Sequence, residues 1–286
     1  MRKTLLWLCA LTIAGSLSLS GQAQTSIGTT PGWLSFFANG QLGAYSCSSG
    51  NCLVEDEYWV SSFNVSAGAT VYSVGNGPII IRSTGPCTIA GEIANTPNLP
   101  AAAGQGQSGI GDFGGGGGGG GGGTVSGAPG YYTAGDANAE INVGGGRGAA
   151  GGGNGSNGGS PVPPQYHQLL SGGTFWPVGG SIGGQGGSSG GAAGQGGGPV
   201  ILVCNSIDFT GTINVSGGNG GPATANNTGG GGGGGAGYVI LSADSYVANT
   251  GAINVSGGTG GSCNGYTGCG VGGDGGNGWS IAITIQ

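Results

Sequence analysis

Basic residues are almost missing from this chain of 286 residues. It contains four, Arg2, Lys3, Arg82 and Arg147, and charged residues of both signs make up only 5% of the sequence. Nucleic-acid binding needs clustered lysine and arginine to neutralise phosphates, so this class of function is excluded. Binding to an anionic membrane surface is disfavoured for the same reason. The single histidine, His167, leaves few candidates for acid–base catalysis.

Leucine, glutamate and lysine are scarce, whereas glycine supplies 79 of the 286 residues. Glycine loses more conformational freedom on folding than any other residue, so this composition excludes an ordinary helical protein. Residues 114–123 are ten consecutive glycines, but no strict Gly-X-Y period runs through the glycine-rich tracts. A collagen triple helix is therefore excluded as well.

The N-terminus has the layout of a secretory signal peptide. Arg2 and Lys3 precede an apolar stretch over residues 5–19, and the small-residue end Gly21-Gln22-Ala23 suits cleavage before Gln24. A membrane anchor is the alternative, but the apolar stretch is shorter than the ~20 residues that a span requires. No later stretch is apolar enough to span a membrane. We expect a protein that is secreted and either extracellular or attached to the cell surface.

Removal of residues 1–23 leaves six cysteines, an even number that favours disulfides in an exported chain. Two pairs are close enough in sequence to close tight loops, and the remaining two cysteines are available for a long-range bridge. The candidate pairs are Cys47 with Cys52, Cys263 with Cys269, and Cys87 with Cys204. Zinc is the rival interpretation, but the spacings do not repeat a zinc-ligand pattern and only one histidine is present.

Two long phrases recur near the C-terminus, PVILVCNSIDFTGTINVSGG at residues 199–218 and YVILSADSYVANTGAINVSGG at residues 238–258. Ile213 and Ile253 are equivalent positions, 40 residues apart, and Ile93 aligns with Ile213. Runs of β-branched and aromatic residues between turn residues are typical of strands. Repeats of this length predict stacked units, because a single unit cannot bury its own apolar face.

We therefore predict an all-β fold with a right-handed parallel β-solenoid spine. The expected strands lie near residues 58–74, 78–93, 139–143, 199–215, 238–255 and 279–285. A β-sandwich is the competing architecture, but it requires hairpins at a shorter spacing. The expected organisation is a signal peptide (1–23), an N-terminal capping region (24–57), first repeats (58–96), glycine-rich excursions (97–198), and C-terminal repeats with a terminal strand (199–286).

Two interpretations of the glycine-rich excursions remain open. A flexible coil is the normal behaviour of glycine- and serine-rich linkers. The alternative is a set of polyglycine II helices laid side by side, whose amides must pair with neighbouring helices because such helices have no internal hydrogen bonds. The scarcity of charge and the anchoring by strands favour packed helices, while the conformational entropy of glycine opposes them. Of the two, we expect packed polyglycine II helices.

The phrases GPIIIRSTGPCTIAGEI, GTINVSGGNGG, GGGGGGGAGYVIL and GAINVSGGTGG resemble those of glycine-rich repeat proteins on bacterial cell surfaces and in bacterial secretomes. The chain is also similar to the glycine-rich tail-tip adhesins of certain phages, in which such motifs form a polyglycine II sandwich. The resemblance covers about residues 55–286. It implies a non-catalytic extracellular role in surface structure or attachment, and it supplies no catalytic residues.

An aromatic and proline-rich insertion at residues 161–178 interrupts the glycine-rich region. Rigid aromatic loops on a scaffold suit recognition of sugars, peptides or surfaces, although the same side chains could instead cover the glycine layers. The tyrosine pair at 131 and 132 has the same two interpretations. The candidate binding residues are Tyr131, Tyr132, Tyr166, His167, Phe175 and Trp176.

An enzymatic site is poorly supported by the sequence. Asp208 and Asp244 occupy comparable places in successive repeats, but such acids usually cap exposed turns, and no spacing requires them to meet Arg82. Residues 272–279 match the calcium-binding β-roll nonapeptide only once, and calcium sites of that kind need tandem copies. We expect no catalytic residue, no metal and no cofactor.

The sequence thus predicts a secreted structural or adhesive protein. Its expected partners are further copies of itself or components of the cell surface and extracellular matrix, glycans included. Filaments are expected because the terminal SIAITI strand carries no charge that would block strand pairing. One alternative is an ice-binding protein, against which the irregular aromatic insertion counts. The other is a polysaccharide-active β-helix enzyme, which the lack of cations disfavours.

Overall fold

A computed structural model describes residues 42–54, 57–73, 78–97, 120–122, 153–157, 180, 183–188 and 190–285. Within these residues every regular element is a strand, which confirms the all-β prediction. The strands are β1 (Ala44–Cys47), β2 (Gly50–Val54), β3 (Glu57–Val60), β4 (Ser62–Val65), β5 (Ala69–Ser73), β6 (Ile79–Ile89), β7 (Glu92–Ala94), β8 (Val200–Phe209), β9 (Thr212–Asn214), β10 (Val239–Asn249), β11 (Ala252–Asn254) and β12 (Ser280–Thr284).

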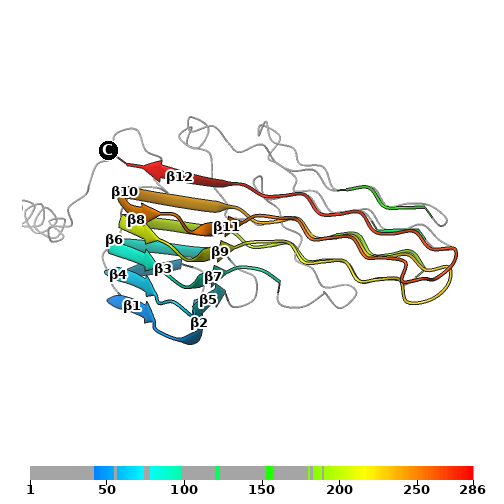
Figure 1. The fold of residues 1–286 in the computed structure, drawn as a ribbon, viewed down its shortest axis with the longest axis horizontal. Coiled ribbons are helices and arrows are strands. Elements are labelled where there is room, and N and C mark those ends of the chain that lie inside the picture. The colour runs from blue at the N-terminus through cyan, green and yellow to red at the C-terminus, as the bar shows by residue number, and fades with distance from the viewer. Residues whose placement is uncertain are drawn as a thin grey trace, which may run out of the picture.

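The strands form two sheets in which all pairings between described strands are parallel. The seven-stranded sheet has the order β1-β4-β6-β8-β10-β12, with β3 also paired to β6, and the five-stranded sheet has the order β11-β9-β7-β5-β2. The chain passes repeatedly from the larger sheet to the smaller one, so successive passes lie in layers (Figure 1). Antiparallel hairpins, which a β-sandwich requires, are not formed by the strands described here.

Recurring residues lie directly over one another in these layers. Ile93, Ile213 and Ile253 form one column of the five-stranded sheet, as their alignment in the sequence predicts. The predicted strand at 139–143 lies outside the described residues. The N-terminal region 24–57, predicted only as a cap, also contributes β1, β2 and the start of β3.

The core lies between the two sheets. Parallel pairing in register places an apolar side chain over an apolar side chain, so the columns are buried along their length. The largest fully buried members are Phe63, Ile79, Ile81, Ile89, Ile93, Leu202, Ile207, Phe209 and Ile213. Each such side chain contributes roughly 1.5–3 kcal/mol when it is removed from water. The Cys87–Cys204 disulfide lies within this core and joins β6 to β8.

A second apolar cluster lies on the opposite face of the seven-stranded sheet. It contains Ile201, Val203 and Ile240 from β8 and β10. Tyr238 stacks on Trp279 at its edge, with 5.0 Å between the ring centroids. Strands β8 and β10 are therefore buried on both faces over their first halves, which explains why both begin with an unbroken apolar run.

A short Asn-Val-Ser motif marks the point where the chain leaves the five-stranded sheet. The Oδ1 atom of Asn214 accepts a hydrogen bond from the Ser216 N–H at 3.2 Å, and Asn254 accepts one from Ser256 at 3.1 Å. Val215, between the two polar residues of the first motif, is fully buried. The asparagine therefore fixes a local turn while the valine holds the chain to the core. This is a physical reason for the recurrence of INVSGG.

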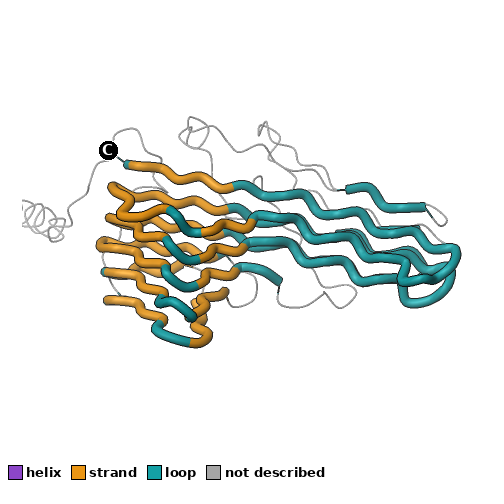
Figure 2. The backbone as a smooth tube through the Cα atoms, viewed as in Figure 1, coloured by secondary structure: helices purple, strands orange, loops and turns teal. Residues whose placement is uncertain are grey.

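Beyond the strands, extended glycine-rich segments run side by side away from the sheets (Figure 2). Residues 229–237 are buried throughout and lie at the centre of these segments, which we call the glycine bundle. Successive N–H groups of this central segment donate to three different neighbouring segments in turn. The donor and acceptor residues are Gly229 and Gly187, Gly230 and Gly270, Gly231 and Gly221, Gly232 and Gly184, Gly233 and Gly273, and Gly234 and Gly218, at 2.7–3.0 Å.

The carbonyl groups of the central segment accept hydrogen bonds from three further segments. The acceptor and donor residues are Gly229 and Gly191, Gly230 and Gly121, Gly231 and Gly261, Gly232 and Gly194, Gly234 and Gly258, and Gly235 and Gly197, at 2.7–2.9 Å. The pattern repeats every three residues, and residues 229–237 are bonded to six neighbouring segments. The backbone groups named in these two sets are therefore satisfied without contributions from side chains.

Glycine is required at these positions because the segments approach one another too closely for any side chain. A Cβ atom on Gly231 would lie 1.9 Å from the Ala192 carbonyl oxygen, and one on Gly233 would lie 2.0 Å from that of Gly258. Both contacts are with backbone, which cannot rotate away as a side chain would. The high glycine content is thus a packing requirement in this part of the chain.

Substitution of Gly233 by alanine tests this requirement. The added Cβ must push two hydrogen-bonded segments apart, so we expect Gly233→Ala to destabilise the protein by roughly 1–3 kcal/mol, the usual cost of overpacking. Urea unfolding followed by intrinsic fluorescence measures the change. The control is Thr259→Ala, because Thr259 is exposed on an outer segment of the same bundle. Equal unfolding midpoints for the two variants would contradict the close packing.

Candidate functional site at the outer tip

The binding residues that the sequence predicts all lie outside the described residues. They are Tyr131, Tyr132, Tyr166, His167, Phe175 and Trp176. The structure describes another candidate instead, two turns at the end of the glycine bundle far from the sheets (Figure 2). These turns, residues 224–228 and 263–269, are called the outer tip below.

A disulfide between Cys263 and Cys269 closes the turn at residues 263–269 of the outer tip. Inside it, the Tyr266 N–H donates a hydrogen bond to the Cys263 carbonyl at 3.0 Å. Asn264 and Gly265 have φ angles of 51° and 80°, the left-handed conformation that an Asn-Gly turn provides at low cost. The sequence predicts this disulfide, together with Cys47–Cys52 and Cys87–Cys204, and the structure contains all three.

The turn at residues 224–228 is held by the side chain of Thr228. Its hydroxyl accepts hydrogen bonds from the N–H groups of Thr224 and Ala225, both at 3.1 Å, and donates one to the Ala225 carbonyl at 2.7 Å. Asn227, next to it, has a φ of 61°. A single hydroxyl thus satisfies three backbone groups that would otherwise face solvent at the end of the turn.

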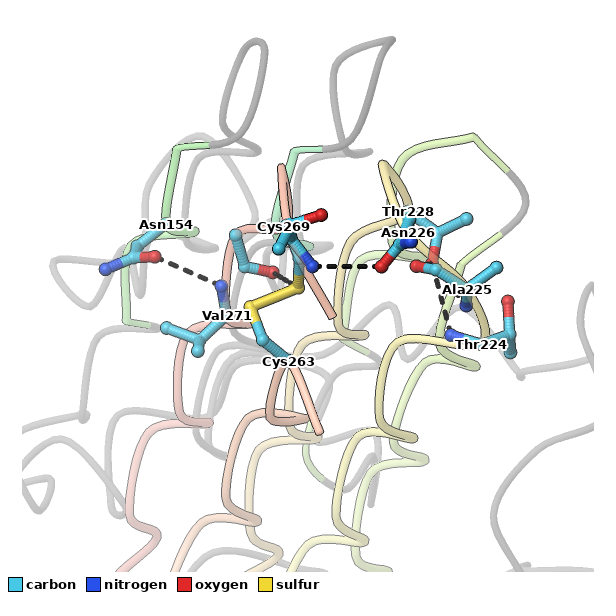
Figure 3. Close-up of a disulfide and its surroundings, with 10 residues drawn as sticks. Asn154, Thr224, Ala225, Asn226, Thr228, Cys263, Cys269 and Val271 are labelled. Carbon is cyan, nitrogen blue, oxygen red and sulfur yellow. Dashed lines mark hydrogen bonds between the residues drawn. A yellow bond between two sulfur atoms is a disulfide. The ribbon is translucent and has the colours of Figure 1, made fainter. Parts of the chain in front are cut away.

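Hydrogen bonds join the two turns to each other (Figure 3). The Thr267 N–H donates to Oδ1 of Asn226 at 3.1 Å, and the Thr267 carbonyl accepts from the Asn227 N–H at 2.8 Å. Gly268 has a φ of 65°, a backbone conformation that residues with a side chain rarely adopt, so glycine is favoured at this contact. The two turns therefore form one ordered surface.

Asparagine and aspartate side chains support the bundle beneath this surface. Their oxygen atoms accept hydrogen bonds from outer N–H groups that a further glycine segment would otherwise accept. The acceptor and donor residues are Asn154 and Val271, Asn157 and Asp274, Asp274 and Gly260, Asn277 and Gly257, and Asn219 and Thr259, at 2.8–3.1 Å. Asp274, the acid of the single β-roll match, is thus engaged with the backbone.

The exposed chemistry of the outer tip is uncharged. Residues 224–228 and 263–269 contain no acidic or basic residue. Their exposed side chains offer amides, hydroxyls and one aromatic ring, and they belong to Thr224, Asn226, Asn227, Asn264, Tyr266 and Thr267. The Cys263–Cys269 disulfide is predicted from the sequence, but Tyr266 within its loop is not. The Asn-Gly pair between the two cysteines is the signal that would have identified an ordered, exposed turn.

The residues considered for catalysis do not come together. Asp208 lies in register with Ala248 rather than with Asp244. Arg82 forms an ion pair with Glu57 instead of with either aspartate. Burial raises the pKa of Asp244, and no cation among the described residues forms an ion pair with it. In the described part of the chain, no three histidine, cysteine, aspartate or glutamate side chains are grouped closely enough to hold a metal ion.

The described part of the chain contains no helix with the length and apolar character of a membrane span.

Comparison with protein-family models, with curated proteins and with solved structures finds no match to this chain. The outer tip is therefore interpreted from its own geometry.

Removal of the buried Cys87–Cys204 disulfide and of the partly exposed Cys263–Cys269 disulfide is expected to have different effects. Cys87→Ser with Cys204→Ser opens a cross-link between two core strands and should cost roughly 2–5 kcal/mol of global stability. Cys263→Ser with Cys269→Ser opens only a short exposed turn, so the urea midpoint should change little while amide exchange at Tyr266 and Thr267 accelerates. If the second double variant unfolds as readily as the first, the tip is not a local unit.

Proposed function

We propose that the chain is a secreted, non-catalytic structural or adhesive protein that acts outside the cell. The observation that carries this proposal is the outer tip, an ordered and uncharged surface held away from the strands by the glycine bundle. Attachment benefits from such rigidity, because a surface that is already ordered loses little conformational entropy on binding. The three disulfides support an oxidising, extracellular location.

The proposed architecture is a right-handed β-solenoid spine that carries a polyglycine II bundle. In support of the spine, parallel strands from successive passes of the chain stack in register. In support of the bundle, the hydrogen bonds of residues 229–237 repeat every three residues and reach six neighbours. A polyglycine II helix has three residues per turn and no internal hydrogen bond, so it must bond in this way.

Secretion and attachment are tested with the full chain. Expressed with its own N-terminal 23 residues, the protein should appear in the medium or on the cell surface by immunodetection. Beads coated with the purified protein should adhere to surfaces coated with extracellular glycans several-fold more than beads coated with albumin. Retention inside the cell, or adhesion equal to that of albumin beads, would contradict the proposal.

Self-association is the second part of the proposed role. The two ends of the layered strands differ in how much apolar surface they leave open to a second copy. At the end of the layers formed by β10, β11 and β12, which we call the open end, Ile253 and Val255 are only partly buried, whereas Ile213 and Val215 one layer below are fully buried. Val247 on β10 is 74% exposed at this end. In the described strands β11 pairs only with β9 and β12 only with β10, so both leave a strand edge that can template further pairing.

Tyr246 covers part of this open end. Its hydroxyl donates to the Leu241 carbonyl at 2.8 Å and lies 3.1 Å from the Ile283 carbonyl, and burial raises its pKa to about 12. At the opposite end β1 and β2 are edge strands as well and Leu42 and Leu53 are exposed, but the core residues Cys47 and Val54 are fully buried, so we call it the closed end. There the Cys47–Cys52 disulfide spans the corner between β1 and β2, and Tyr45 stacks on Phe63 with 5.0 Å between the centroids. A second copy of the chain is therefore expected at the end formed by β10, β11 and β12.

Two charge substitutions separate the ends. Val247→Lys places a charge on the open end and should lower the association constant at least tenfold, because a lysine without a partner is costly to bury. Leu53→Lys is the matched control, since Leu53 is 52% exposed near the closed end. Sedimentation over a range of protein concentrations measures both. A wild-type protein that stays monomeric, or equal losses in the two variants, would contradict association through the open end.

A further inference from the structure

We propose that the outer tip is a binding site for neutral saccharides. The inference rests on the proposed attachment role and names both the surface and the chemical class of its ligand. The binding residues are Tyr266 and Asn264 in the disulfide-closed turn, with Asn226, Asn227 and Thr224 from the adjacent turn.

The charge distribution favours a neutral ligand. The chain carries ten acidic residues, yet none of them falls in either turn of the outer tip. A charged ligand would lose part of its hydration on binding there without gaining an opposite charge. A polyhydroxylated neutral ligand loses only hydrogen bonds to water, and these can be replaced by amides and hydroxyls.

The polar groups of the tip are suited to that replacement. Oδ1 of Asn226 already accepts the Thr267 N–H, which fixes the orientation of the amide and leaves the two Nδ2 donors for a ligand. Asn264 and Asn227 add exposed amides, each able to donate and accept. Adjacent sugar hydroxyls are donors and acceptors at short spacing, and planar amides match both functions.

Tyr266 supplies the apolar part of the site. Its side chain is 38% exposed, although it sits in a turn whose backbone is closed by a disulfide. The face of a tyrosine ring packs against the C–H face of a sugar, while its hydroxyl stays in water or bonds to the ligand. The aromatic ring and the amides therefore form the amphipathic combination typical of small polar ligand sites.

The site is ordered before a ligand arrives. Among the described residues, the non-glycine positions with positive φ are Ser188, Asn227 and Asn264, and all three lie in turns at this end of the bundle. Such conformations cost free energy and persist where neighbouring contacts hold them, as the Thr267 hydrogen bonds and the disulfide do here. Binding to a surface already held in this way needs little further ordering.

Affinity electrophoresis tests the site with the full chain. Native gels that contain dextran, mannan or galactomannan provide neutral probes, and gels that contain alginate provide an anionic one. We expect retardation by at least one neutral polysaccharide and none by alginate. Tyr266→Ala should weaken binding at least tenfold. Asn264→Gly removes the amide but keeps a residue that favours positive φ, so it should weaken binding several-fold without unfolding the turn.

The matched control is Tyr72→Ala, because Tyr72 is a partly exposed tyrosine on β5, at the opposite part of the molecule from the tip. It should bind as the wild-type protein does. No retardation by any neutral probe, stronger retardation by alginate, or unchanged binding by the Tyr266 and Asn264 variants would each overturn the proposal. Bead adhesion separates the two claims. Adhesion without polysaccharide binding overturns only the saccharide site, and polysaccharide binding without secretion or adhesion overturns only the attachment role.

Discussion

The structure depends on one requirement, that the backbone N–H and C=O groups of the extended glycine segments find partners in other segments. An extended segment cannot bond within itself, and a buried unpaired backbone group costs as much as a lost hydrogen bond. Residues 229–237 meet the requirement by bonding to six neighbours. That arrangement works only where no Cβ stands between the chains, because a Cβ added to Gly233 would lie 2.0 Å from the Gly258 carbonyl oxygen. The composition of the chain and the geometry of the bundle are therefore two aspects of the same constraint.

The layered strands make this pairing possible. Parallel strands lie about 4.8 Å apart, so segments that leave successive layers begin side by side and in register. Gly217 donates to Ser256, and Gly230 to Gly270, each pair coming from equivalent places in adjacent layers. The entropic cost of bringing glycine segments together is thus largely met by the apolar columns, in which Ile93, Ile213 and Ile253 stack. The outer tip in turn depends on the bundle for its position.

Side-chain pattern determines how far the sequence predicts this structure. The strands β6 to β12 and the pairing of Ile213 with Ile253 follow from the recurring apolar phrases. Two disulfides follow from an even cysteine count and short closures, and the third joins the two cysteines that remain. Strands β1 and β2 are not predicted, because the serines and glycines around Cys47 and Cys52 are typical of turns. The glycine segments have no side-chain pattern, so packing can be expected from their lack of charge, but which segments bond to one another cannot be predicted. Tyr266 is missed because a lone tyrosine between cysteines carries no pattern of its own.

Residue-resolved amide hydrogen exchange over residues 229–237 tests the central requirement most directly. We predict that these amides exchange slowly, with protection close to that of the amides in β8 and β10. The N–H groups of residues 229–234, 236 and 237 each donate to a neighbouring segment, and all of these residues are buried. Exchange at the rate of an unprotected chain, while β8 and β10 remain protected, would contradict the account. The bundle would then not be held together by its backbone.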